Sequence, residues 1–477
     1  MNDKHIPQPP FAAWQQLRSG PRRERSRICE CLAEPGWLTC VLMFVAVLCP
    51  LVSPVHSADE KQAPVSGFLE AGVGRVDITP EEPILLRGSP VPKPASGANT
   101  RLYVRALVLS AGSTKVAIVT VDTLKYPYEL ARQGRVKIEQ ATGIPATHVI
   151  VCASHTHSGP LWSYYDDRLV NVIPDAVTRA MHDLAPCTVG VAEGVVDGVS
   201  QCRRVIKDGH AWNRWQLPPG EDANYPPEGP YDPAFDVLAL TGRNGKHKAI
   251  LYNFACHAAA NVEPRISADF PGDVEVSVRK QLGYDASVFF LTGACGDVNV
   301  LGSWRRRGLL GEKLGDEILH CLGRLSPIAK PSLGVEFREF PMAGRENPQF
   351  QEAEVARNWP AQLEHYRKAF NEMKTRAKPT YPYPMTGIRL GDDFALVTNA
   401  TELFCSIGMR IKEKSPFKYT MVVEQTNGGY GYVPSAKAFE GGSYETWFGE
   451  HSLLTTQAGN IIERNSLDIL QGLSAAK

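Results

Sequence analysis

Two histidines stand one residue apart directly after a strongly apolar segment of the chain. The segment reads Val149-Ile-Val-Cys-Ala-Ser, and His155-Thr-His157 follows it before a Ser-Gly-Pro step that turns the chain. Residues two positions apart on an extended backbone point to the same side, so both imidazoles are able to face one site. Imidazole is a common protein ligand for transition metals. The pair therefore predicts either a metal site or two polar residues at a sheet edge.

A third histidine, His257, ends another apolar segment, which spans 250–256. Two separate strands with the same ending favour one shared metal, although a hydrogen bond to a backbone carbonyl would also explain His257 alone. The strand expected at 394–398 leads through a short turn to Glu402, at the start of an expected helix. Because the helix dipole accounts for an acidic residue there, Glu402 is a ligand candidate only together with the histidines.

Two glycine-rich loops complete the set of possible site segments. One reads Gln425-Thr-Asn-Gly-Gly-Tyr-Gly-Tyr432, with Tyr444 further along, and its glycines allow the backbone to approach a ligand closely. The other follows the strand expected at 288–291 and carries Asp297 and Asn299. It lacks the Gly-Lys-Ser/Thr ending of a phosphate-binding loop, which argues against nucleotide binding.

These segments need a scaffold that brings strand ends together. Short apolar runs predict strands at 107–109, 116–121, 148–152, 249–255, 288–291 and 394–398. Helices are expected at 128–142, 168–184, 272–282, 311–322, 404–414 and 458–473. The stretch at 347–377 predicts a solvated, peripheral helix, and the aromatic, Pro-rich stretch at 208–233 an irregular insertion. This alternation predicts an α/β fold of mixed β-sheets covered by helices, with the metal site at strand ends.

Composition and charge narrow the class of partner. The 477-residue chain is 43% hydrophobic and 21% charged, which is the balance of a globular protein with a sizeable core. Lys plus Arg equals Asp plus Glu at 51 each, which leaves no surplus of positive charge for a nucleic-acid partner. Seven cysteines follow the first 58 residues without any CxxC pair, which predicts buried free thiols rather than disulfides or a zinc ribbon.

The N-terminal region predicts export. Residues 37–51 form an apolar run of about 15 residues after an arginine-rich stretch, whereas a membrane span needs about 20. Small residues around Ser57 and Ala58 suit cleavage. We therefore expect residues 1–58 to be a signal peptide or an uncleaved N-terminal anchor and residues 59–66 to be a linker. Residues 67–477 would then form one globular domain outside the cytoplasm.

Two motifs resemble signatures of the neutral ceramidases. They are HTHSGP at 155–160 and AGVGRVDITP at 71–80. The resemblance continues in the same order through His257, the Gly-Asp-Val turn at 296–298, Glu402 and the tyrosine loop, and covers roughly residues 68 to 460. It implies that the domain at 67–477 is a zinc-dependent amide hydrolase that cleaves ceramide to sphingosine and a fatty acid.

The resemblance also implies the roles of individual residues. One zinc ion per chain would be held by His155, His257, Glu402 and Tyr432. The residues that contact the substrate, support the site or move protons would be His157, Arg203, Tyr444, Asn299 and Asp269. Arg204 is an alternative to Arg203 as the arginine that contacts the substrate carbonyl. Zinc would activate a water molecule by lowering its pKa toward ~7, and it would polarise the amide carbonyl.

Two departures from the family pattern leave the substrate open. Asn299 stands where the ceramidases have a serine implicated in catalysis, and an amide cannot replace it as a nucleophile. The chain also stops soon after Tyr444, whereas ceramidases of this family usually continue into an immunoglobulin-like domain. Three hypotheses follow. They are a zinc amidase that acts on ceramide and contacts a membrane surface, a related hydrolase of another amide or ester such as an N-acyl amino sugar or peptide-like compound, and a non-catalytic zinc- or glycan-binding protein.

Overall fold

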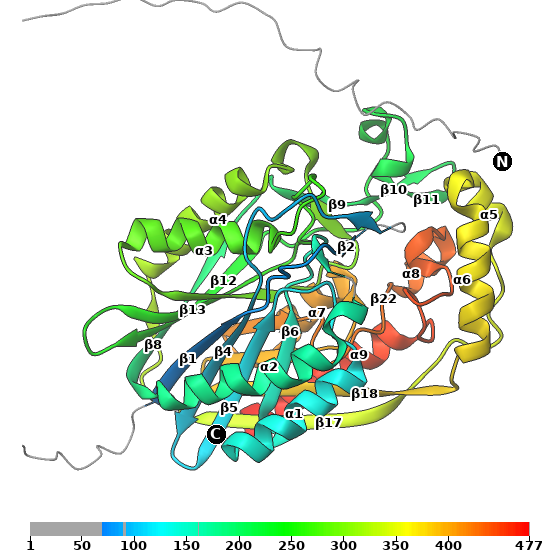
Figure 1. Ribbon diagram of the computed structural model, residues 1–477. Coiled ribbons are helices and arrows are strands. Elements are labelled where there is room, and N and C mark those ends of the chain that lie inside the picture. The colour runs from blue at the N-terminus through cyan, green and yellow to red at the C-terminus, as the bar shows by residue number, and fades with distance from the viewer. Residues whose placement is uncertain (1–68, 89–91, 161, 477) are drawn as a thin grey trace, which may run out of the picture. The chain divides into compact units, whose positions relative to one another are not determined.

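The structure, a computed structural model, describes residues 69–88, 92–160 and 162–476 (Figure 1). The expected signal segment at 1–58 and the linker at 59–66 lie outside these residues. A search of the described helices finds none with the length and apolar character that crossing a membrane requires.

Within the described residues, the larger sheet is a mixed sheet of nine strands (Figure 1). Eight strands run in the order β14-β13-β12-β8-β1-β4-β5-β6, and β16 pairs with β8. Neighbours are antiparallel except for β13–β14 and β5–β6, which are parallel. The strands are β1 (Leu69–Asp77), β4 (Tyr103–Ala111), β5 (Thr114–Val121), β6 (Val149–Ala153), β8 (Ala185–Val195), β12 (Ala234–Gly242), β13 (His247–Phe254), β14 (Ser287–Thr292) and β16 (Ser326–Pro327).

The sheet has two halves, β14-β13-β12-β8 and β1-β4-β5-β6. A short ladder joins the halves at β8 and β1, and their outer strands, β14 and β6, come together again. Strands β1 and β8 pair through three residue pairs, which begin at Leu69 and Cys187. On the other side, Thr292 at the end of β14 donates a hydrogen bond from Oγ1 to the carbonyl of Ala153, at the end of β6, over 3.0 Å. The carboxyl ends of both parallel pairs therefore converge, which is where loops from distant parts of the sequence can form a site.

A second sheet packs its apolar face against the first. It contains β17 (Leu333–Ala343), β18 (Thr380–Leu390), β19 (Phe394–Thr398) and β21 (Tyr419–Val423), in that order. Phe289 of the larger sheet shares one buried core with Leu396 and Met421 of the smaller sheet. Its neighbour Phe290 faces the helices instead, as the two-residue period of a strand requires. Burying each such side chain stabilises the fold by about 1.5–3 kcal/mol.

Helices cover the outer faces of both sheets, which gives four layers (Figure 1). Apolar side chains of α3 and α4 share a core with β12–β14, and those of α1 and α2 share one with β4–β6. On the other side, α7 and α9 cover the smaller sheet. These helices are α1 (Tyr128–Thr142), α2 (Trp162–His182), α3 (Asp269–Leu282), α4 (Arg307–Leu322), α7 (Cys405–Lys414) and α9 (Ala458–Ala475). The predicted α/β class, with mixed sheets covered by helices, is confirmed.

The helix predictions agree with the structure except in the polar stretch. The helix predicted at 128–142 coincides with α1, and all seven cysteines of the described residues are buried free thiols, as predicted. The single helix predicted at 347–377 is instead α5 (Glu352–Asn358), a 3₁₀ turn and α6 (Leu363–Arg376). Pro360 explains the break, because it lacks an N–H donor and keeps Trp359 out of the helical region, at φ −150° and ψ 61°.

Glu402 lies in a two-residue strand and not at the start of a helix, which corrects the prediction from sequence. This strand, β20 (Glu402–Leu403), pairs in parallel with β22 (Tyr432–Val433), and α7 begins only at Cys405. The insertion predicted to be irregular at 208–233 also contains a strand, β11 (His210–Asn213), which pairs with β10 (Arg204–Lys207). In both places the pairing with another segment decides the backbone conformation, and local propensity does not reveal it.

Candidate metal centre and active site

Three histidines converge where the carboxyl ends of the parallel strands meet. His155 and His157 follow β6, and His257 follows β13. One ring nitrogen of each lies within 4.8 Å of the corresponding nitrogens of the other two. The rings of His155 and His257 have their centroids 4.6 Å apart at an angle of 70°. The structure thus combines the two histidine motifs in one group that is able to hold a metal ion.

The backbone fixes which nitrogen each imidazole offers. The Nδ1 atom of each histidine lies at hydrogen-bond distance from a carbonyl oxygen, which is only an acceptor, so Nδ1 carries the proton. The three acceptors are the carbonyls of Leu124 at 2.7 Å from His155, Gly88 at 3.0 Å from His157 and Val298 at 3.0 Å from His257. The lone pair is then on Nε2, and histidines held in this way are typical metal ligands.

A buried carboxylate completes the group. Glu402 Oε2 lies 3.4 Å from Nε2 of both His155 and His257. Glu402 Oε2 and the Nε2 atoms of His155 and His157 are buried and have no hydrogen-bond partner among the described residues. Each such unsatisfied atom costs about 1–3 kcal/mol unless another group, such as a cation, satisfies it. Imidazoles with one carboxylate are a donor set that Zn²⁺ takes in catalytic sites, so these residues fit such an ion.

Two tyrosines and an arginine line one side of this group. Tyr432 stands opposite Glu402 on the β20–β22 ladder, and its hydroxyl accepts a hydrogen bond from Tyr444 over 2.5 Å. Arg203 donates from Nη2 to the Tyr444 hydroxyl over 3.1 Å, and its Nη1 lies 3.1 Å from His257 Nε2. Of these three residues, Arg203 contacts a histidine directly, Tyr432 is paired with Glu402, and Tyr444 joins the group through Arg203 and Tyr432.

Of the two arginines that the sequence left open, Arg203 reaches the histidines and Arg204 does not. Arg204 is fully buried, and its guanidinium contacts the carboxylates of Glu228 and Glu445 instead. Asn299 accepts a hydrogen bond through Oδ1 from Arg203 Nη1 over 3.3 Å. The short strand that carries Asn299, β15 (Val298–Val300), is therefore also part of the candidate site.

Asp269 supports the loop that carries His257. It is fully buried at the start of α3, and its carboxylate accepts hydrogen bonds from the backbone N–H groups of Ala260, Asn261 and Phe270 over 3.0, 2.7 and 2.8 Å. Among the described residues, the hydrogen bonds of this carboxylate go to backbone groups and not to a histidine. A role for Asp269 as a base stays a prediction.

Burial sets the protonation states in the site. It lowers the pKa of His157 well below its usual range and that of His257 to about 4. Burial opposes ionisation of Glu402, but the two imidazoles beside it outweigh burial and hold the pKa of Glu402 well below its usual range. Burial and the Glu402 carboxylate raise the pKa of the Tyr432 phenol. At neutral pH the site thus offers His157 and His257 as neutral imidazoles, together with one carboxylate and a protonated phenol.

Sequence reasoning missed three residues around the site. Glu445 accepts a hydrogen bond from Arg203 Nε over 2.9 Å. The Trp215 ring, 43% exposed, lies 5.3 Å from Arg203 Cζ and 6.2 Å from the Tyr444 ring, and His451 stacks on Tyr444 at 5.7 Å. The aromatic content of the insertion at 208–233 was the one signal for Trp215, whereas the sequence around Glu445 and His451 contains none.

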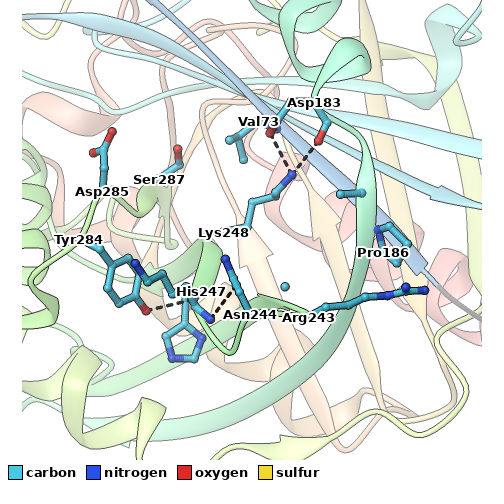
Figure 2. A pocket seen from close by; sticks show the side chains of 13 residues that line it. Val73, Asp183, Pro186, Arg243, Asn244, His247, Lys248, Tyr284, Asp285 and Ser287 are labelled. Carbon is cyan, nitrogen blue, oxygen red and sulfur yellow. Dashed lines mark hydrogen bonds and ion pairs between the residues drawn. The ribbon is translucent and has the colours of Figure 1, made fainter. Parts of the chain in front are cut away.

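A cavity of about 700 Å³ lies at the opposite ends of the strands (Figure 2). Its lining includes His247, which begins β13, and Ser287, which begins β14. Figure 2 shows Lys248 in this cavity, where its Nζ donates to Asp183 Oδ2 over 3.1 Å. No residue predicted for the site is among those that line this cavity. The cavity is therefore separate from the histidine group, which follows the other ends of the same strands.

Comparisons with known proteins bear on the fold. No family model matches this sequence, and no curated protein matches it. The crystal structure of neutral ceramidase from Pseudomonas aeruginosa superposes with a TM-score of 0.67 at 16% identity, over 86% of this chain and 75% of that chain. A structure of a ceramidase complexed with C2 gives a TM-score of 0.68 at 16% identity, over 86% and 76% of the two chains. The chain therefore shares the fold of neutral ceramidase.

Proposed function

We propose that this protein is a zinc-dependent hydrolase of the neutral ceramidase family that cleaves an N-acyl amide bond, with ceramide as the first substrate to test. The observation that carries the proposal is the convergence of His155, His157 and His257 on the buried Glu402 carboxylate, in a chain with the neutral ceramidase fold. The third hypothesis, a non-catalytic binding protein, does not account for an arginine and two tyrosines arranged beside this group.

The donor atoms support one zinc ion held by His155, His257, Glu402 and Tyr432, with His157 next to it. Glu402 Oε2 is within 3.4 Å of two imidazole nitrogens, and Tyr432 is its partner on the β20–β22 ladder. A zinc ion held by these residues would supply a Lewis acid that polarises the amide carbonyl and activates water.

Arg203 and Tyr444 are placed to stabilise negative charge on the carbonyl oxygen of the substrate. They share a hydrogen bond of 3.1 Å, Arg203 Nη1 lies 3.1 Å from His257 Nε2, and the Tyr444 hydroxyl donates to Tyr432. Donors fixed in advance for an oxyanion contribute strongly, and removing one typically lowers kcat by about 10²–10³-fold.

His157 is placed to move the proton. Its Nδ1 proton is held by the Gly88 carbonyl, and its buried Nε2 has no hydrogen-bond partner among the described residues. A neutral imidazole with a free lone pair can accept a proton from the attacking water and return it to the leaving amine.

Asn299 supports attack by water without an acyl-enzyme stage. Its amide has no nucleophilic oxygen or sulfur, and its Oδ1 is already bonded to Arg203. The Nδ2 donors of Asn299 remain for a substrate oxygen, so the residue would bind the substrate and would not attack it.

Trp215 favours the second hypothesis, a related hydrolase of a different amide or ester. Its ring is 43% exposed next to Arg203 and Tyr444, which combines an aromatic face with polar donors. Such a surface suits an N-acyl amino sugar, whose apolar ring face can pack on the indole while its hydroxyl groups meet the polar donors. A lipid substrate would bring the protein to a membrane surface, and the signal or anchor proposed at 1–58 would place it outside the cytoplasm.

A substrate panel separates the two hypotheses. The zinc-loaded protein would be assayed for release of free acid from ceramide, from an N-acyl amino sugar and from a short-chain ester. Ceramide turnover with the highest kcat/KM supports the ceramidase hypothesis, and preference for either other substrate supports the alternative. Absence of turnover on all three by protein that holds one zinc would contradict both.

A further inference from the structure

A fully buried carboxylate, Glu445, lies between two consecutive arginines behind the candidate site. Its side chain has no exposed surface. Glu445 Oε1 accepts a hydrogen bond from Arg203 Nε over 2.9 Å, and Oε2 accepts from Arg204 Nη1 over 2.5 Å. Asn213 Nδ2 also donates to Oε2 over 3.2 Å. Burial opposes ionisation of Glu445, but the two guanidinium groups outweigh it and lower its pKa, so the carboxylate is charged at neutral pH.

The contact with Nε determines where the rest of the Arg203 guanidinium points. This group is planar and rigid, so fixing Nε on Glu445 also fixes the directions of Nη1 and Nη2. Those two atoms are the ones that reach the site, with Nη2 on the Tyr444 hydroxyl at 3.1 Å and Nη1 on Asn299 Oδ1 at 3.3 Å. Glu445 follows Tyr444 in one 3₁₀ turn (Tyr444–Thr446). The same turn therefore carries the Tyr444 hydroxyl and the carboxylate that holds the Arg203 guanidinium.

Arg204 depends much less on Glu445. Its guanidinium also bonds Glu228, through Nη2 to Oε1 over 2.9 Å and through Nε to Oε2, and the carbonyl of Gly442 over 2.7 Å. Among the described residues, the carboxylate that pairs with Arg203 is that of Glu445. Removal of the Glu445 charge would therefore release mainly Arg203.

We infer that Glu445 is a positioning residue, which holds the Arg203 guanidinium in the orientation that stabilises the substrate carbonyl oxygen. The inference rests on the proposed function, because the orientation of Arg203 affects turnover only if Arg203 contacts the substrate. Glu445 itself touches no reacting atom. Its effect on the reaction passes entirely through Arg203.

Glu228 provides a matched control for the experiment. Glu445→Gln and Glu228→Gln each replace a buried carboxylate of Arg204 by an amide of the same shape, but only Glu445 contacts Arg203. Both variants are expected to unfold at lower temperature. Glu445→Gln is expected to lower kcat about 10–100-fold with KM changed less than about threefold, because a misplaced donor loses oxyanion stabilisation. Glu228→Gln is expected to keep kcat within about twofold.

A double variant and a shorter acid make the test specific. In an Arg203→Ala background, adding Glu445→Gln is expected to change kcat less than twofold, since the two residues act as one unit. If Glu445→Gln does not fold, Glu445→Asp keeps the charge while drawing the guanidinium back by about one methylene, and it is expected to lower kcat as well. Equal loss of kcat in Glu445→Gln and Glu228→Gln would overturn the inference.

Crystal structures of the same variants give a readout that does not depend on turnover. In Glu445→Gln the Arg203 Nη atoms are expected to leave Tyr444 and Asn299, and in Glu228→Gln they are expected to stay. An unmoved Arg203 in Glu445→Gln would refute the positioning role. If the parent protein cleaves no acyl amide or ester, the proposed function fails, and these structures still decide how Arg203 is held.

Discussion

Glu402 and Tyr432 are direct partners on the two-residue parallel ladder between β20 and β22. Adjacent strands in parallel register point equivalent side chains to the same face, so this ladder places a carboxylate and a phenol side by side. Glu402 is in turn 3.4 Å from the Nε2 atoms of His155 and His257. The four residues proposed as ligands thus come from four separate parts of the sequence that meet at one point.

The first prediction concerns which residues hold the metal. His155→Ala, His257→Ala and Glu402→Gln should each reduce bound zinc from one per chain to a small fraction after dialysis, measured by elemental analysis. His157→Ala should keep its zinc and lose turnover by at least about 100-fold, because it removes the proton carrier. Loss of zinc in His157→Ala as complete as in His155→Ala would show that His157 is a ligand.

The second prediction concerns the contact that orients His157. A Cβ atom built on Gly88 would lie 1.9 Å from the His157 carbonyl oxygen, so Gly88→Ala must displace the loop whose carbonyl accepts the His157 Nδ1 proton. We expect a loss of about 1–3 kcal/mol in the free energy of unfolding, from urea titration, and lower kcat with zinc retained. Gly308→Ala, where the new Cβ meets open space, is the control and should leave both unchanged. Normal kcat in Gly88→Ala would mean that this contact does not orient His157.

The third prediction is a pH dependence of stability. Burial raises the pKa of Asp297 to about 6, above the value of about 3.9 expected when the chain is unfolded. Folding therefore favours the protonated acid, and its contribution is present below about pH 4 and lost as the pH rises through about 6. Asp297→Asn should gain up to about 3 kcal/mol relative to the parent between pH 4 and pH 7, measured by urea unfolding. A difference that does not change with pH would contradict the buried acid.

The fourth prediction concerns substrate binding by the exposed ring of Trp215. Trp215→Ala should raise KM about 2–10-fold for the preferred substrate, which corresponds to the loss of one aromatic contact, and should leave bound zinc at one per chain. Trp212→Ala is the comparison, because Trp212 lies on β11 opposite Val205. Equal effects of the two substitutions on KM would argue that Trp215 acts through the stability of the insertion.

The chemistry-bearing residues were predictable because they follow strong local patterns. An apolar strand followed by histidine marked His155, His157 and His257, and the structure confirms that the three lie together. Helix 128–142 was predictable for the same reason, since its periodicity is local.

The features that the sequence did not reveal depend on contacts between distant segments. The strand conformation of Glu402 comes from pairing with Tyr432, and a helix start was the better local prediction. Glu445 is a buried acid in a 3₁₀ turn, and the positions of Arg203 and Arg204 explain it. Such partners are set by the tertiary fold, and no spacing rule along the chain identifies them.

The measurement that tests the central claim most directly is release of fatty acid from ceramide by the zinc-loaded protein, before and after removal of zinc with a chelator. The account predicts turnover that disappears with the metal, returns when zinc is restored and is absent from His155→Ala. Turnover that survives complete removal of zinc, or that persists in His155→Ala, would contradict a metal centre built on these histidines.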